Sequence, residues 1–106
     1  WVDIMKQENA DIIVAVVHSG EKPKKPKNPG NRIQELAQEV DGIDAIVAAH
    51  THKEISQHDY NNKSDETVIV TQPGKHGECI SRINFKLKKE QNGWIVVDKS
   101  SEIVKF

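Results

Sequence analysis

The chain has 106 residues, which is enough for one domain or part of one and for a core of modest size. Its 15 basic and 16 acidic residues nearly cancel, so no overall field favours nucleic acid or an anionic membrane as a partner. No apolar run reaches the roughly 18 residues of a transmembrane helix, and the single cysteine excludes an intrachain disulfide. The sequence starts at Trp1, within what reads as the middle of a helix, which indicates a piece cut from a longer protein.

Two apolar runs that each end in a histidine organise the first half of the chain. Residues 12–17 are continuously apolar, which predicts a strand buried on both faces of a parallel sheet, and His18 follows them. A second strand, predicted over residues 43–49, leads into His50 and His52. Between them the apolar residues recur at helical spacing, with Asn31 as the predicted N-cap and Gly42 as the residue that ends the helix. The pattern predicts a βαβ unit.

This topology brings the histidines to one place. Parallel neighbouring strands end at the same edge of a sheet, where ligands bind in open α/β folds, so we expect His18, His50 and His52 to meet there. Three imidazoles suit zinc and other first-row divalent ions, whereas magnesium and calcium prefer oxygen ligands. Asp41 and Asp44 lie at the opposite end of the second strand, so the sequence offers no convincing carboxylate to bridge two metal ions.

The second half of the chain predicts a β meander. Residues 53–66 are polar and rich in turn formers, which predicts a connection, and a short strand is expected over residues 67–71. Apolar and polar residues alternate over residues 82–88, and Asn92-Gly93 is the strongest short hairpin signal in the chain. His76, in a glycine-flanked loop, is a candidate for contact with a substrate. Residues 21–30 carry three prolines and four lysines and predict an exposed loop.

A family resemblance follows from segments that occur in a particular order. These are residues 10–20 with His18, Asn31, residues 36–37 and 41–46, His50-Thr51-His52, and residues 72–77. In this order they resemble the second half of the metallophosphoesterase domain of the calcineurin-like superfamily. The similarity is greatest to its 5′-nucleotidase and 2′,3′-cyclic-nucleotide 2′-phosphodiesterase branch. The resemblance implies that residues 1–106 are the C-terminal part of a catalytic domain built as a four-layer αββα sandwich, without its upstream half and nucleotide-binding domain.

The resemblance also implies a chemistry. It implies two divalent metal ions, with zinc, manganese, iron and magnesium not distinguished, and hydrolysis of nucleotide or cyclic-nucleotide phosphoesters by a metal-activated hydroxide. His18 and His50 match ligands of the second metal, and His52 matches a ligand of the first. Asn31 is a further candidate for substrate contact, and Ala49 stands where the family usually has glycine. The catalytic residues are expected upstream, so this chain alone is expected to be inactive and to hold one metal ion or none.

The residues are also compatible with two other functions. The first is a non-catalytic module in which the three histidines hold a single structural zinc. The second, nucleic-acid binding through the lysines of residues 22–27, lacks interleaved aromatic residues. An exposed sheet edge would favour self-association. The sequence leaves the localisation open, although the parent family is often secreted, periplasmic or cell-wall associated.

Overall fold

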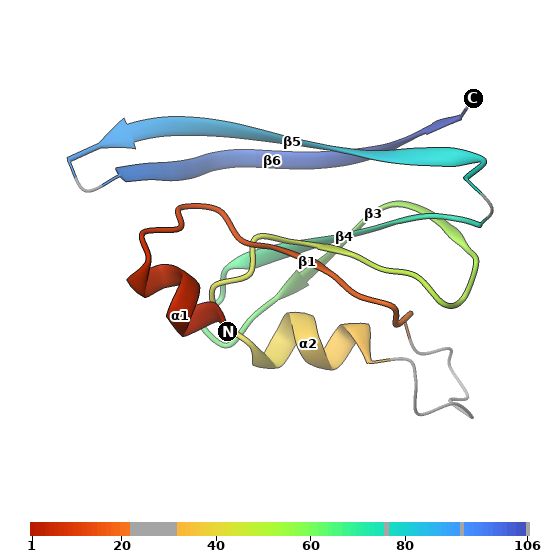
Figure 1. Ribbon diagram of the computed structural model, residues 1–106, viewed down its shortest axis with the longest axis horizontal. Coiled ribbons are helices and arrows are strands. Elements are labelled where there is room, and N and C mark those ends of the chain that lie inside the picture. Colours follow the sequence, from red (N-terminus) through yellow and green to blue (C-terminus); the bar gives the residue numbers. More distant parts are fainter. Residues whose placement is uncertain (22–31, 76, 92, 106) are drawn as a thin grey trace.

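The computed structural model describes residues 1–21, 32–75, 77–91 and 93–105, which form two helices and six strands. Figure 1 shows their arrangement. Within the described residues, no helix is long and apolar enough to cross a membrane. The elements in chain order are α1 (Val2–Gln7), β1 (Val14–Val16), α2 (Ile33–Glu39), β2 (Ala45–Val47), β3 (Glu54–Asn61), β4 (Thr67–Pro73), β5 (Cys79–Glu90) and β6 (Gly93–Lys105).

The centre of the fold is a four-stranded mixed sheet in the order β1-β2-β4-β3. β1 pairs with β2 in parallel, with Val14 opposite Ala45, and β2 pairs with β4 in parallel, with Ala45 opposite Ile69. β3 runs antiparallel to β4 along the other edge of the sheet. The predicted parallel pair of the βαβ unit is therefore confirmed, and the strands that precede the histidines end at the same edge.

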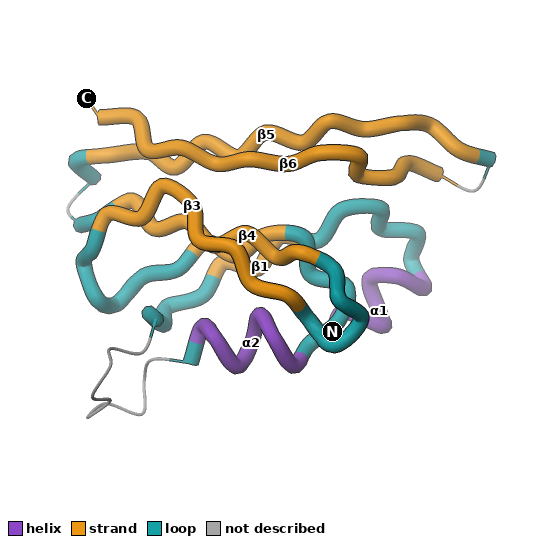
Figure 2. Tube along the Cα trace, turned by 180° about the vertical axis from the view of Figure 1, so that it is seen from behind, coloured by secondary structure: helices purple, strands orange, loops and turns teal. Residues whose placement is uncertain are grey.

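Three layers build the molecule, because α2 covers one face of the sheet and the hairpin of β5 and β6 covers the other (Figures 1 and 2). The hairpin packs against β3 and β4, and α2 packs against the opposite face. The core lies between α2 and the sheet, and its buried residues are Ile13, Ile33, Ala37, Ile43, Ile46, Ala48, Val68 and Val70. The structure thus has an α/β architecture with a separate β hairpin.

The first strand is shorter and more exposed than the sequence predicts. β1 covers only Val14–Val16, and the side chains of Val14 and Val16 are 41% and 80% exposed. The reason is that β1 is an edge strand and the hairpin packs over β3 and β4. The carboxylate of Asp44 accepts the Ile13 amide at 2.9 Å, so that amide is satisfied outside the sheet. The strand that is buried on both faces is β4.

The predicted β meander is wrong in two respects. Residues 54–61, expected as part of a polar connection, form β3, which pairs with β4 and has an irregular register between Ile55 and His58. That irregularity breaks the alternation of apolar and polar residues by which a half-buried strand is recognised. In addition, β5 and β6 form their own two-stranded sheet instead of extending the first. The hairpin itself is confirmed, with Glu90 opposite Gly93, while Asn92 lies outside the described residues.

The start of α2 also differs from its prediction. The helix begins at Ile33 with Arg32 as its N-cap residue, and Asn31 lies outside the described residues. The amide of Arg32 donates to the Ser19 hydroxyl at 2.8 Å, and the amide of Ile33 donates to the Gly20 carbonyl at 3.2 Å. Groups beyond β1 therefore satisfy two of the amides at the start of the helix.

Lysine and hydroxyl side chains join the hairpin to the sheet. Lys99 of β6 donates from Nζ to the carbonyl oxygens of Asp44, at 2.8 Å, and of Thr67. Burial of this ammonium group lowers the pKa of Lys99, against the raising effect of Asp44 and other nearby carboxylates. Further along, the hydroxyls of Thr71 in β4 and Ser81 in β5 lie 2.8 Å apart. Hydrogen bonds thus hold the hairpin in place along the sheet.

Candidate metal centre

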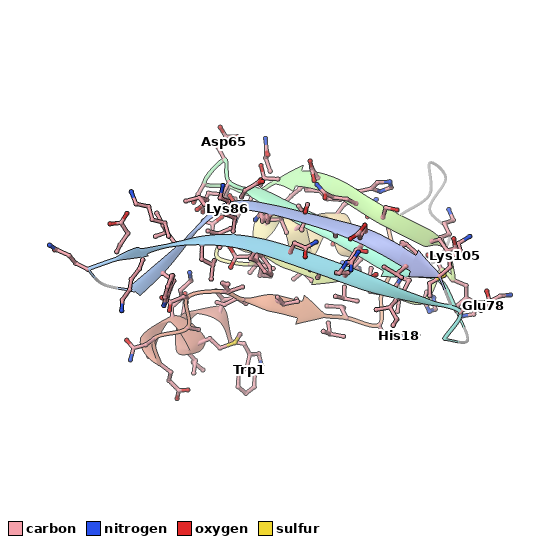
Figure 3. All side chains as sticks on the ribbon, turned by 90° about the horizontal axis from the view of Figure 1, so that it is seen from above. Trp1, His18, Asp65, Glu78, Lys86 and Lys105 are labelled. Carbon is pink, nitrogen blue, oxygen red and sulfur yellow. The ribbon has the colours of Figure 1, made fainter. Side chains whose placement is uncertain are left out.

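His18 and His50 lie side by side where β1 and β2 end. The ladder continues past both strands, because Val17 donates to the Val47 carbonyl at 2.9 Å and Ala49 donates to the Ser19 carbonyl at 3.0 Å. These bonds hold the two loops together just where each carries a histidine. Nε2 of His18 and Nδ1 of His50 are 3.3 Å apart, and the two rings meet edge to face with centroids 5.2 Å apart. Figure 3 shows His18 at this end of β1.

The separation of the two nitrogens fits a shared metal ion. Zinc binds imidazole nitrogen at about 2.0–2.1 Å in tetrahedral geometry, which places two ligand nitrogens about 3.3–3.4 Å from each other. The observed distance of 3.3 Å between His18 and His50 agrees with this value, and in the metal-free chain it is the distance of a hydrogen bond between the two rings. Both side chains are exposed, so an ion from solution can reach them. The residues present therefore fit a divalent ion held between β1 and β2.

His52 is not grouped with the other two histidines. The described residues contain no set of three or more His, Cys, Asp or Glu side chains placed to hold one metal ion. The backbone of His50 has a φ of 77° and that of His52 a φ of 59°, a left-handed conformation that is uncommon outside glycine. Such conformations persist where the surrounding structure imposes them, and they gather at functional sites. The expected convergence of three imidazoles is thus found for His18 and His50 alone.

The two carboxylates that precede β2 form hydrogen bonds within the fold. Asp44 accepts the Ile13 amide, and Asp41 accepts the hydroxyl of Ser64 at 2.8 Å. Both residues precede β2, whereas the histidines follow β1 and β2. The predicted substrate contacts, Asn31 and His76, lie outside the described residues, as do the lysines of residues 22–27.

Sequence reasoning missed a polar cluster beside the histidine loop. Glu21, in the loop that follows β1, contacts His58 Nδ1 with both carboxylate oxygens, at 2.8 and 3.0 Å, and accepts a hydrogen bond from the hydroxyl of Tyr60. The cluster lines a cavity of about 250 Å³ that Thr51 also borders. No sequence signal linked these residues, because the strand that carries His58 and Tyr60 was not predicted.

The environment of Tyr60 predicts an alkaline effect on stability. Burial, then the hydrogen bond to Glu21, then the negative charge of Glu21 raise the pKa of the Tyr60 phenol above its ordinary value of 10.0. The Tyr60 phenol ionises near pH 10 in the unfolded chain and at a higher pH in the folded chain. The folding stability that this difference contributes is therefore complete below pH 10 and falls as the pH rises further.

Tyr60 is the only tyrosine in the chain, so ultraviolet absorbance of tyrosinate measures this pKa directly. We expect ionisation well above pH 10 in buffer and at about pH 10 in concentrated urea. Glu21→Gln should lower the folded pKa without reaching the unfolded value, because burial is the larger cause. Identical titrations of the folded and the unfolded chain would contradict the prediction.

Comparison with known proteins shows that the chain is similar to short segments of larger phosphoesterases. No family model matches the sequence. The trifunctional nucleotide phosphoesterase protein YfkN of Bacillus subtilis is 31% identical over an alignment of 108 positions, which covers 93% of this chain and 7% of YfkN. A 2′,3′-cyclic-nucleotide 2′-phosphodiesterase/3′-nucleotidase of Yersinia enterocolitica is 29% identical over an alignment of 112 positions, which covers 96% of this chain and 17% of that protein. The chain therefore spans less than a fifth of these relatives.

Solved structures agree with the sequence matches. The crystal structure of the calcineurin-like phosphoesterase YfkN from Bacillus subtilis matches with a TM-score of 0.78 and 30% identity, over 98% of this chain and 34% of that one. A 5′-nucleotidase precursor from Thermus thermophilus shares the fold, with a TM-score of 0.76 at 17% identity, over 98% of this chain and 21% of that one. The chain is thus homologous to a short segment of YfkN and of related nucleotide phosphoesterases, which confirms the resemblance seen in its sequence.

Proposed function

We propose that residues 1–106 are the C-terminal part of a metallophosphoesterase domain, within a four-layer αββα sandwich, in an enzyme that hydrolyses nucleotide phosphoesters with two metal ions. The observation that carries the proposal is the 3.3 Å separation of His18 Nε2 and His50 Nδ1 at the edge of the sheet where β1 and β2 end. Two imidazoles on adjacent parallel strands are a preformed half of a metal site. Homology to nucleotide phosphoesterases supports the assignment.

The roles proposed for the three histidines follow from the family resemblance, and the placement of His18 beside His50 supports the first of them. His18 and His50 would hold one ion together, and His52, at the far side of Thr51, would contribute to the other. When bound, the ions would activate water and neutralise the charge that develops on the phosphoryl oxygens. The remaining ligands and the catalytic groups would come from residues outside these 106. The histidines of this chain therefore position metal ions, and they form one wall of the site.

The substrate class rests on the relatives. One of them, the Yersinia enterocolitica protein, is named for 2′,3′-cyclic nucleotides and 3′-nucleotides, which favours these phosphoesters for the whole protein. The rival function, a module with a single structural zinc held by three histidines, gains no support from the described residues, because they contain no set of three such ligands.

The test is a hydrolysis assay on the full product of the gene, with 2′,3′-cyclic AMP, 3′-AMP and 5′-AMP as substrates. We expect at least one to be hydrolysed, activity to cease with a chelator, and manganese or zinc to restore it, because the ions supply the activated water. The 106-residue chain alone, loaded with the same metals, is the control and should show no turnover. Hydrolysis that a chelator leaves unchanged, or turnover by the short chain, would contradict the proposal.

A further inference from the structure

We propose that Gln72 is a positioning residue of the metal centre: its buried amide holds the hydroxyl of Thr51 and thereby fixes the loop that carries His50 and His52. This inference rests on the proposed function, which assigns the histidines to metal ions. The contacts from which it is argued lie within this chain. It extends the candidate site from the histidines to a side chain on β4 that lies beneath their loop.

The first observation is the environment of Gln72. Its side chain, at the carboxyl end of β4, is completely buried. Nε2 donates to Thr51 Oγ1 at 2.8 Å, while Oε1 has no hydrogen-bond partner among the described residues. A buried amide with one unpaired atom weakens a fold compared with an apolar side chain of the same shape. Packing alone therefore does not explain why a glutamine occupies this position. Its hydrogen bond to Thr51 does explain it.

The second observation is the conformation of the loop. Thr51 lies between two histidines that both have a left-handed backbone, with φ of 77° and 59°. Such a backbone relaxes unless neighbouring groups hold it. The Thr51 amide donates to the Ala49 carbonyl at 3.0 Å, and the hydroxyl of the same residue accepts from Gln72. Thr51 is thus tied to the loop by its backbone and to the sheet by its side chain.

The third observation is that the end of β4 runs beside the whole loop. Ahead of the histidines, Ala48 donates to the Thr71 carbonyl at 2.9 Å, and behind them Gly74 donates to the Lys53 carbonyl at 3.1 Å. The bond from Gln72 to Thr51 lies between these two main-chain bonds. Residues 71–74 therefore hold the loop at both ends and in the middle, and the middle contact is the one that a side-chain substitution can remove.

The experiment compares zinc affinity and thermal stability across matched variants of the 106-residue chain. Gln72→Met and Thr51→Val remove the hydrogen bond with little change in shape, and Thr51→Ser keeps the hydroxyl. We expect Gln72→Met and Thr51→Val each to weaken His50-dependent zinc binding about tenfold, as loss of a group that orients a metal ligand typically does. Thr51→Ser should bind zinc normally. Gln57→Met, which removes an amide on β3 bonded to Ser101, is the control and should also bind normally.

Two further readouts separate positioning from general stability. The double variant Gln72→Met/Thr51→Val should lose no more affinity than either single variant, because both remove the same bond. The melting temperature of Gln72→Met should be unchanged or higher, because the unpaired buried oxygen is gone. Additive losses of affinity, or a melting temperature that falls together with affinity, would overturn the inference.

Hydrogen exchange in the metal-free chain distinguishes failure of this inference from failure of the proposed function. Gln72→Met should speed exchange of the Thr51 and Ala49 amides, whereas Gln57→Met should not. If these amides are unaffected by Gln72→Met, the inference is wrong whatever the metal result. If they respond but the unmutated chain binds zinc independently of His50, the loop is held as inferred, and the metal role given to His50 is wrong.

Discussion

His50→Ala should weaken zinc binding by the 106-residue chain more than about 100-fold, which exceeds the usual effect of removing a group that only supports a ligand. The reason is geometric, since His50 Nδ1 and His18 Nε2 are separated by 3.3 Å, the distance for two nitrogens on one ion. His18→Ala should have an equally large effect, because a lone exposed imidazole binds zinc weakly. Isothermal titration with zinc, checked by elemental analysis of the dialysed protein, measures both affinity and stoichiometry.

The matched control is His58→Ala. His58 is also exposed but contacts Glu21 on the α2 side of the sheet, so its removal should leave zinc binding unchanged. We expect about one ion per chain, because the described residues offer one such pair of neighbouring imidazoles. Equal losses of affinity for all three variants would show that zinc binds histidines nonspecifically and would contradict the assignment.

Ile46→Ala should cost about 2–5 kcal/mol of unfolding free energy, the range seen when a fully buried aliphatic side chain is shortened to alanine. Ile46 is completely buried at the middle of β2 and lies in the core beneath α2. Domains of this size have a total stability of only about 5–15 kcal/mol, so the variant should lie close to unfolding at room temperature. Because β2 carries the loop with His50, zinc binding should be lost wherever this strand unfolds.

Urea denaturation followed by circular dichroism measures the change. Val16→Ala is the control, because Val16 lies on β1 of the same sheet but is 80% exposed, and its shortening should change stability by less than about 0.5 kcal/mol. If the two variants lost similar stability, the burial assigned to β2 would be wrong.

The parallel pair of strands and the position of its histidines were predictable, and the layers around them were not. Continuous apolar runs separated by a periodic helix identify a βαβ unit, and that topology alone brings His18 and His50 to one edge. The exposure of Val16 could not be predicted, because it depends on which strands the hairpin covers. β3 escaped prediction because the register irregularity after Ile55 breaks its alternation.

Within the candidate site, the sequence identified the histidines proposed to bind metal but not the residues that contact their loop. Gln72 reads as the first residue of a Gln-Pro-Gly turn, whereas in the structure β4 continues to Pro73 and buries the glutamine side chain. Its contact with Thr51 spans 21 residues of sequence and follows no local pattern. Likewise, the cluster of Glu21, His58 and Tyr60 joins the loop after β1 to β3, which lies at the opposite edge of the sheet. Contacts of this kind depend on tertiary packing, which the periodicity of apolar residues in the sequence does not predict.

The separation of His52 from the pair formed by His18 and His50 has a consequence for how the proposed enzyme would acquire its metals. One ion would find two of its ligands already adjacent within this chain, whereas the other would find His52 alone among the proposed ligands in the described residues and would await groups from elsewhere in the protein. The two positions would then fill in a fixed order, with the His18–His50 position occupied first. Occupancy of the second position would therefore show that the distant parts of the domain have assembled correctly, so metal content would measure how complete that assembly is.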